Sequence, residues 1–386
     1  MTASSTPAPA SAPGAQAHRV IFIDFARAIA VVLMVIGHAV SALLAPQYNS
    51  GPWYDRWQFQ RGLTSSLFLL LSGFAFSVAT SQHWASHTRW SPFVAKRLRR
   101  FIFFMLIGYS LHFPVLPIAA LRAATDAQWR TFLLVDVLQL IGATFVIVQL
   151  LVLVCRTRTV FMWVSLALAA VLVAFTPAVW SIDWTQHLPI SLAAYLSQGT
   201  GSIFPLFPFA ASVLVGAGMG QLYARWGAAN LTTFANTALL GTGVVLTLIV
   251  FAGRAMGLTV YPPGPSAVIP PEFVLRTGVS LILLGAIAYA SHRIQHLPRM
   301  LAAAAQESLL VYYVHLCVLY GSIWSPGLLQ AIGPTLRPLQ TLPIAVVLVV
   351  SMVVLAWQWN WCKHARPTAA RWIRVGVAVL VLYRLL

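Results

Sequence analysis

Three ionisable side chains occur in one otherwise apolar stretch of the chain, and their spacing could support chemistry. The stretch ends at His38 and contains Asp24 and Arg27. On a helix, Asp24 and Arg27 are neighbours three residues apart that can pair. Arg27 and His38 are eleven residues apart, which leaves about 20° of angular offset and roughly 16 Å along the helix axis. The three side chains therefore form one polar stripe.

The stripe has a structural interpretation and a catalytic one. A charge near the centre of a bilayer costs about 2.5–3.5 kcal/mol on insertion scales, so these side chains should face protein or water. In the structural interpretation, Asp24 and Arg27 form an ion pair and His38 is a hydrogen-bonded interfacial residue. In the catalytic interpretation, His38 is a base, because the pKa of histidine lies near neutral pH. Arg27 would then hold an anionic or carbonyl-bearing substrate. The spacing alone leaves both interpretations open.

The composition identifies the elements that must position this stripe. The 386 residues are 59% hydrophobic and 8% charged, whereas an average soluble domain is about 25% charged. These proportions exclude an ordinary soluble protein and predict an all-α fold, a polytopic membrane helical bundle. Residues 1–18 are rich in Ala, Pro, Ser and Thr, and we expect a disordered tail there. Residues 19–386 are expected to form a single integral-membrane domain.

Apolar segments long enough to cross about 30 Å of hydrocarbon follow one another along the chain. Ten of them lie at about 20–44, 62–80, 100–120, 131–154, 159–177, 203–222, 232–252, 272–291, 302–324 and 342–362. An eleventh segment, 372–386, has only 15 residues and is either a short span or an interfacial helix. We therefore expect 10–11 transmembrane helices.

The basic residues predict the orientation of the bundle. With ten or eleven spans, 15 of the 24 Lys and Arg residues share a side with the amino terminus, and 8 lie on the other side. The positive-inside rule then predicts a cytoplasmic amino terminus. Contacts with lipid headgroups account for the net charge of +17, so no nucleic-acid partner is expected. The three cysteines are too scattered for a zinc site, and we expect no metal.

Several motifs follow the stripe, and together they resemble a known family. In order along the chain they are the Asp-x-x-Arg of Asp24 and Arg27 with His38, Ser66–Phe74, the basic run Lys96–Arg100, Asp136–Gly142, Phe204–Phe209 and Ser308–His315. This order is similar to that of the integral-membrane acyltransferases. That group includes the acyltransferase 3 family and the heparan-α-glucosaminide N-acetyltransferase-like proteins. The resemblance covers about residues 19–320 and departs from the family at Ala28, often Gly, and Phe209, in place of Trp.

The resemblance implies an acyltransferase that takes an acyl group, usually acetyl, from cytoplasmic acyl-CoA. The acceptor would be a hydroxyl or amine of an extracytoplasmic glycan or another envelope or secreted compound. His38 would be the catalytic histidine and Arg27, paired with Asp24, would help to bind the donor. Direct deprotonation of the acceptor and a covalent acyl-histidine are both compatible with this pattern. The family and the loop charges favour a bacterial inner membrane, with lipid as a further partner; the oligomeric state is not predicted.

Further candidate residues come from the same motifs. Arg97, Arg99 and Arg100, or alternatively Arg156 and Arg158, could bind the phosphates of CoA, although the pattern favours a topology determinant for each of them taken singly. Asp136 could orient His38 or receive an acceptor hydroxyl. The histidines of the basic loops, among them His83, are assigned no chemistry.

Two further helices contribute candidates. Tyr312 and His315 share a helical face with Ser308 and could line a substrate channel. Alternatively, His315 makes a structural hydrogen bond to a neighbouring span. Ser72, also a candidate binding residue, and Gly73 are expected to permit close helix packing beside the first span.

A transporter or flippase of a lipid-linked sugar or small solute is the alternative function. Such a protein also needs buried polar residues, but it does not need a base aligned with an anion-binding arginine. Loss of acyl transfer on substitution of His38 would separate the two functions.

Overall fold

The structure is a computed structural model that describes residues 20–113, 118–258, 270–291, 293, 296–322 and 325–385. Across these residues the secondary structure is helical, and one isolated bridge joins Leu44 to Leu336. The all-α fold is therefore confirmed. The predicted tail at 1–18 lies outside the described residues.

The predicted spans correspond to helices or to helices joined end to end. The long helices are α1 (Ile21–Leu43), α2 (Pro52–Gln82), α4 (Pro92–Ser110), α6 (Val137–Cys155), α7 (Arg158–Trp180), α9 (Leu206–Leu222), α11 (Thr242–Ala255), α12 (Pro270–Ser291), α14 (Ser308–Tyr320), α16 (Pro338–Ala365) and α17 (Pro367–Leu385). The short ones are α3 (Trp84–His87), α5 (Asp126–Leu133), α8 (Ile190–Ala193), α10 (Leu231–Phe234), α13 (Arg299–Gln306) and α15 (Leu328–Ala331).

Fewer helices meet a strict length and composition test for a span than the sequence predicts. In the described part of the chain eight do, or nine if α13 and α14, bent by 81° about Glu307, count as one span. The two predicted spans that fall short, α4 and α17, contain four and three Lys or Arg residues. Charge, not length, therefore separates them from the others. The 19 residues of α17 reach about 28 Å.

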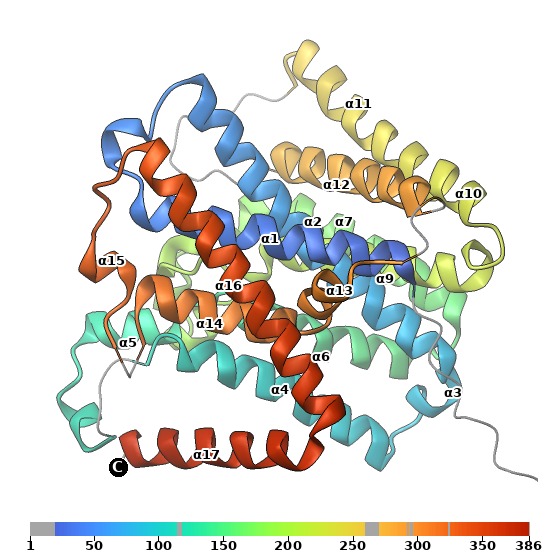
Figure 1. Ribbon diagram of the computed structural model, residues 1–386. Coiled ribbons are helices and arrows are strands. Elements are labelled where there is room, and N and C mark those ends of the chain that lie inside the picture. Colours follow the sequence, from blue (N-terminus) through green and yellow to red (C-terminus); the bar gives the residue numbers. More distant parts are fainter. Residues whose placement is uncertain are drawn as a thin grey trace, which may run out of the picture.

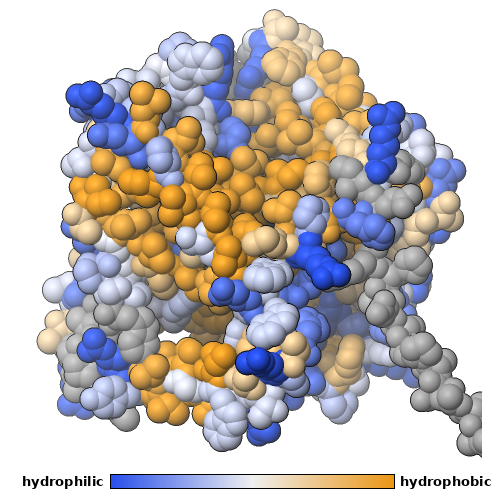
Figure 2. All heavy atoms as spheres, viewed as in Figure 1, coloured by the Kyte–Doolittle hydropathy of each residue, from blue (hydrophilic) through white to orange (hydrophobic). Residues whose placement is uncertain are grey.

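Figure 1 shows how the helices are arranged, with α1 (dark blue) crossing the middle of the bundle and α16 (red) passing in front of it. We call the side at which α1 begins the near face and the side at which it ends the far face. Figure 2, in the same view as Figure 1, shows a broad apolar band across the molecule. The exposed apolar residues of α16 include Val346, Val347 and Val350. Side chains of this kind suit contact with lipid.

Glycines bring α2 and α9 into close contact at the centre of the bundle. A Cβ added to Gly73 of α2 would overlap the carbonyl of Val213, and one added to Gly216 of α9 would overlap that of Leu70. Small residues permit such close approach of helix backbones in membranes. The prediction that Gly73 packs beside the first span is therefore wrong, because its neighbour is α9.

Candidate active site

The polar stripe predicted on the first span lies on α1. Arg27 Nη1 is 3.8 Å from Asp24 Oδ1, and each side chain is 22% exposed. The predicted ion pair is therefore present near the start of the helix. Arg27 and His38 open into two different cavities, and these cavities organise the site.

The far cavity, about 450 Å³, lies toward the end of α1. His38 lines it together with Asp136, and so do Arg61 and His112, neither of which was a candidate from the sequence. The sequence signal for Arg61 is weak, since it lies next to the start of a predicted span, where charged residues are ordinary. His112 lies inside the span predicted at 100–120 and belongs to none of the motifs noted in the sequence.

Asp136 is held in place at the start of α6. Its Oδ1 accepts a hydrogen bond from the Val137 backbone N–H at 2.7 Å, as the N-cap of the helix. Its Oδ2 accepts from the Tyr312 hydroxyl at 3.3 Å and lies 3.6 Å from His112 Nε2. The carboxylate thus joins α6 to α14 and to the end of α4, and it shares the cavity with His38.

His38 has aromatic neighbours on α14. The ring centroids of His38 and His315 are 5.3 Å apart, and the Tyr320 ring lies edge-on to His38 at 6.0 Å. His315 is fully buried, and its Nδ1 donates to the Val311 carbonyl at 2.7 Å. That bond places the proton on Nδ1 and leaves Nε2 with a free lone pair. Among the described residues this buried Nε2 has no hydrogen-bond partner.

The near cavity, about 560 Å³, is strongly basic. Arg27, Lys96, Arg97 and Arg100 line it, together with Ser72, Ser308 and the loop histidines His83 and His87. Arg99 is exposed and is not part of this lining, since it lies on another side of α4. The histidines to which the sequence assigned no chemistry thus lie beside the basic residues.

Arg97 is fixed by residues from two other helices. It donates to His87 Nδ1 and to Thr80 Oγ1, each at 2.8 Å, and its guanidinium carbon lies 4.0 Å from the centroid of the Phe76 ring. His87 is 3% exposed, and burial followed by the charge of Arg97 lowers its pKa to about 4. A neutral imidazole at neutral pH is consistent with its role as hydrogen-bond acceptor.

Two side chains line both cavities. Phe68 of α2 and Tyr312 of α14 belong to the near and the far lining alike. Ser72, one turn after Phe68, donates to the Phe68 carbonyl at 2.8 Å. We call Phe68 and Tyr312 the shared wall. The two cavities therefore meet at these two aromatic side chains.

The predicted site residues thus divide into three groups. His38, Asp136 and Tyr312 meet in the far cavity, and Arg27, Arg97, Arg100 and Ser72 meet in the near one. Asp24, Arg99 and His315 line neither cavity; Asp24 pairs with Arg27 and His315 lies against His38.

The fold and the site define a class: a helical membrane protein with two cavities that meet within the bundle. The model of the family described as heparan-alpha-glucosaminide N-acetyltransferase, catalytic, matches residues 19–261. The chain belongs to this family, whose description is that of an N-acetyltransferase. No curated protein matches the chain. The family match includes Arg27, His38 and Asp136 and ends before α14.

Proposed function

We propose that the protein transfers an acetyl group from acetyl-CoA, bound in the near cavity, to a hydroxyl or amine of an acceptor in the far cavity. The observation that carries this proposal is the shared wall. Phe68 and Tyr312 contact a cavity with four basic side chains on one side and the cavity of His38 on the other. Family membership supports the acyl-transfer chemistry, and the acceptor is most simply a glycan of the cell envelope.

The near cavity fits the phosphate-rich part of CoA. Lys96, Arg97 and Arg100 line it, and charge-assisted hydrogen bonds from such groups bind phosphates strongly. The chain contains no glycine-rich phosphate-binding motif, so these side chains would carry the recognition. The proposal assigns the near face to the cytoplasm of a bacterial inner membrane, in keeping with the bias of Lys and Arg toward that side.

His38 would handle the proton during the reaction. In a direct transfer its imidazole takes the proton from the acceptor hydroxyl, and the acceptor oxygen bonds to the thioester carbonyl carbon. The carbon–sulfur bond breaks with its electron pair on sulfur, which then takes the proton from the imidazolium. In a covalent transfer the His38 imidazole attacks the thioester carbonyl carbon, the carbon–sulfur bond breaks, and CoA leaves as the thiol with the proton of the imidazole. The acceptor oxygen then bonds to the acyl carbon, the carbon–nitrogen bond breaks, and the proton of the acceptor hydroxyl returns to the imidazole.

Neither route needs a metal, because a thioester is already activated toward attack. Asp136 would orient the acceptor, since its carboxylate is anchored by Val137 and Tyr312 and lies in the same cavity as His38. Arg27 would act on the donor side, where its guanidinium lines the near cavity.

The experiment is a transfer assay with purified protein in lipid vesicles and acetyl-labelled acetyl-CoA. We expect His38→Ala to lower label transfer and CoA thiol release by about 10²–10⁴-fold, the usual contribution of a general base. His187→Ala is the matched control, because His187 lies in an exposed far-face loop outside both cavity linings. Equal turnover by the two variants would overturn the proposal.

The same assay separates the two routes and the alternative function. Label retained on the wild-type protein in a single turnover without acceptor indicates an acyl-histidine, and its absence indicates direct transfer. A transporter would bind or move solute without releasing CoA thiol.

A further inference from the structure

Arg61 is a cation of the far cavity to which the proposed reaction gives no role. Within the described residues it is the only Lys or Arg that lines this cavity, and its side chain is exposed. Its Nη1 donates to Ser41 Oγ at 2.8 Å and to Gln58 Oε1 at 3.3 Å. Both acceptors are neutral, so the positive charge is not compensated by them.

Arg61 is held against the turn of α1 that carries His38. Its aliphatic stem crosses Gly37, where an added Cβ would lie 3.4 Å from Arg61 Cγ. Ser41, its hydrogen-bond partner, in turn donates to the Gly37 carbonyl at 2.8 Å. The missing side chain at Gly37 and the hydroxyl of Ser41 therefore fix the guanidinium beside His38.

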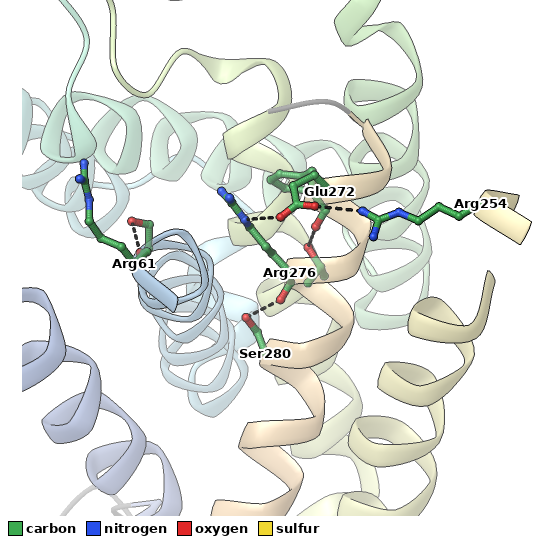
Figure 3. Close-up of polar contacts among 8 residues, drawn as sticks. Arg61, Arg254, Glu272, Arg276 and Ser280 are labelled. Carbon is green, nitrogen blue, oxygen red and sulfur yellow. Dashed lines mark hydrogen bonds and ion pairs between the residues drawn. The ribbon is translucent and has the colours of Figure 1, made fainter. Parts of the chain in front are cut away.

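Two other arginines at this face, Arg254 and Arg276, have a different environment. Arg254 Nη2 and Arg276 Nε lie 3.2 and 3.3 Å from the two oxygens of Glu272. Figure 3 shows these two side chains converging on that carboxylate, whereas Arg61, on the neighbouring helix α2, has no such partner in the part of the chain that is described. Arg254 and Arg276, whose charge is balanced by a carboxylate, and Arg61, whose charge is not, thus lie on the same side of the bundle.

The anion within the far cavity is already engaged. Asp136 accepts hydrogen bonds from Val137 and Tyr312 and lies beside His112. The cavity therefore contains a satisfied carboxylate and a guanidinium with N–H groups to spare. A guanidinium presents these groups as a planar fork that matches a carboxylate or a phosphate.

We propose that the far cavity selects an acceptor with a carboxylate or phosphate close to the group that is acylated, and that Arg61 binds this anion. The inference rests on the proposed function, because it describes the acceptor of that reaction. It makes Arg61 a specificity-determining residue and gives the site a preference between acceptors that His38 alone would not provide.

The test measures binding without chemistry, so that it does not depend on acyl transfer. Glucose, glucuronate and glucose 6-phosphate serve as probes, since they share a ring and differ in the anion. Their dissociation constants for the purified protein are measured by thermal shift. We expect both anionic sugars to bind about tenfold or more tightly than glucose, the usual contribution of a hydrogen bond to a charged group. Their ratio shows whether carboxylate or phosphate is favoured.

Three arginine variants complete the experiment. Arg61→Gln should abolish the preference for the anionic sugars, Arg61→Lys should restore part of it, and Arg254→Gln should leave it unchanged. A wild-type protein that binds the three sugars equally, or not at all, would overturn the inference, as would equal losses in the Arg61→Gln and Arg254→Gln variants. His38→Ala should keep the preference even if acyl transfer fails.

Discussion

The two cavities differ in the charges that they present more than in their size. The near cavity is lined by four Lys or Arg side chains and by no carboxylate of the described residues, whereas the far cavity combines one arginine with Asp136, His38 and His112. A purely basic lining suits the binding of a polyanion. A mixture of carboxylate and imidazole suits proton transfer. Under the proposed function, this difference assigns donor binding and chemistry to opposite sides of the shared wall.

Adjacent arginines on α4 offer the sharpest test of this division. Arg100 lines the near cavity and Arg99 does not. We expect Arg100→Gln to raise the KM for acetyl-CoA roughly tenfold to a hundredfold, because a charged hydrogen bond contributes about 1.5–3 kcal/mol, with kcat unchanged. Arg99→Gln is the matched control and should leave both constants as they are. A similar rise in KM for both variants would mean that the net charge of the face, not the cavity, attracts the donor.

A substitution at the centre of the bundle should affect both cavities at once. Gly216→Ala places a Cβ against the backbone carbonyl of Leu70, which cannot move aside. We expect a loss of about 1–3 kcal/mol in stability, the usual effect of overpacking, seen as a lower thermal unfolding midpoint. Gly376→Ala, with open space around the added Cβ, should be neutral. A midpoint as high in Gly216→Ala as in Gly376→Ala would contradict the close contact of α2 and α9.

Substitution of His315, which contacts the His38 ring, should have a smaller effect on turnover. His315 contacts the His38 ring and presents a lone pair without a partner in the described chain. We interpret it as a positioning residue, and His315→Leu should lower kcat about fivefold, the equivalent of one contact between aromatic rings. The KM for acetyl-CoA should not change, and the pH dependence of kcat should shift because His38 is affected. A change in donor KM alone would assign His315 to the near cavity instead.

The smallest expected effect is a pH dependence of stability that comes from His87 in the near cavity. The pKa of His87 is lowered to about 4 by burial and by Arg97, with His83 adding to the effect and Gln149 opposing it. In the unfolded chain the pKa of histidine is about 6.5, so between these values the unfolded state binds more protons. Stability should therefore fall as the pH is lowered from about 6.5 to about 4. Unfolding midpoints of wild type and His87→Gln across this range test it, since the variant should show a flatter dependence.

Hydropathy was sufficient to predict the helices, because lipid contact requires long apolar segments wherever they occur. The break at Glu307 was not predictable in this way. Its carboxylate is paired with Lys363 and accepts a hydrogen bond from Asn360 at 3.0 Å, both on α16. Partners more than fifty residues away leave no local signal in the sequence.

The part of the site that lies on one helix was predicted from the sequence, and the part that several helices assemble was predicted less completely. Arg27 and His38 share one helix, so their common direction follows from spacing alone. The far cavity draws on four helices and their ends, and Arg61 and Tyr320 were missed because residues at the ends of spans have an ordinary explanation as topology or interface residues. Which of Arg99 and Arg100 lines the near cavity depends on how α4 is rotated against its neighbouring helices, and the sequence alone does not show that rotation.

The bend at Glu307 has a consequence for hydration. Because α13 turns away by 81°, α14 keeps 13 residues, or about 20 Å, against a hydrocarbon thickness of about 30 Å. A helix as short as α14 requires the bilayer to thin or water to enter beside it. Under the proposed function, water beside α14 would keep a hydrophilic acceptor solvated on its way to His38.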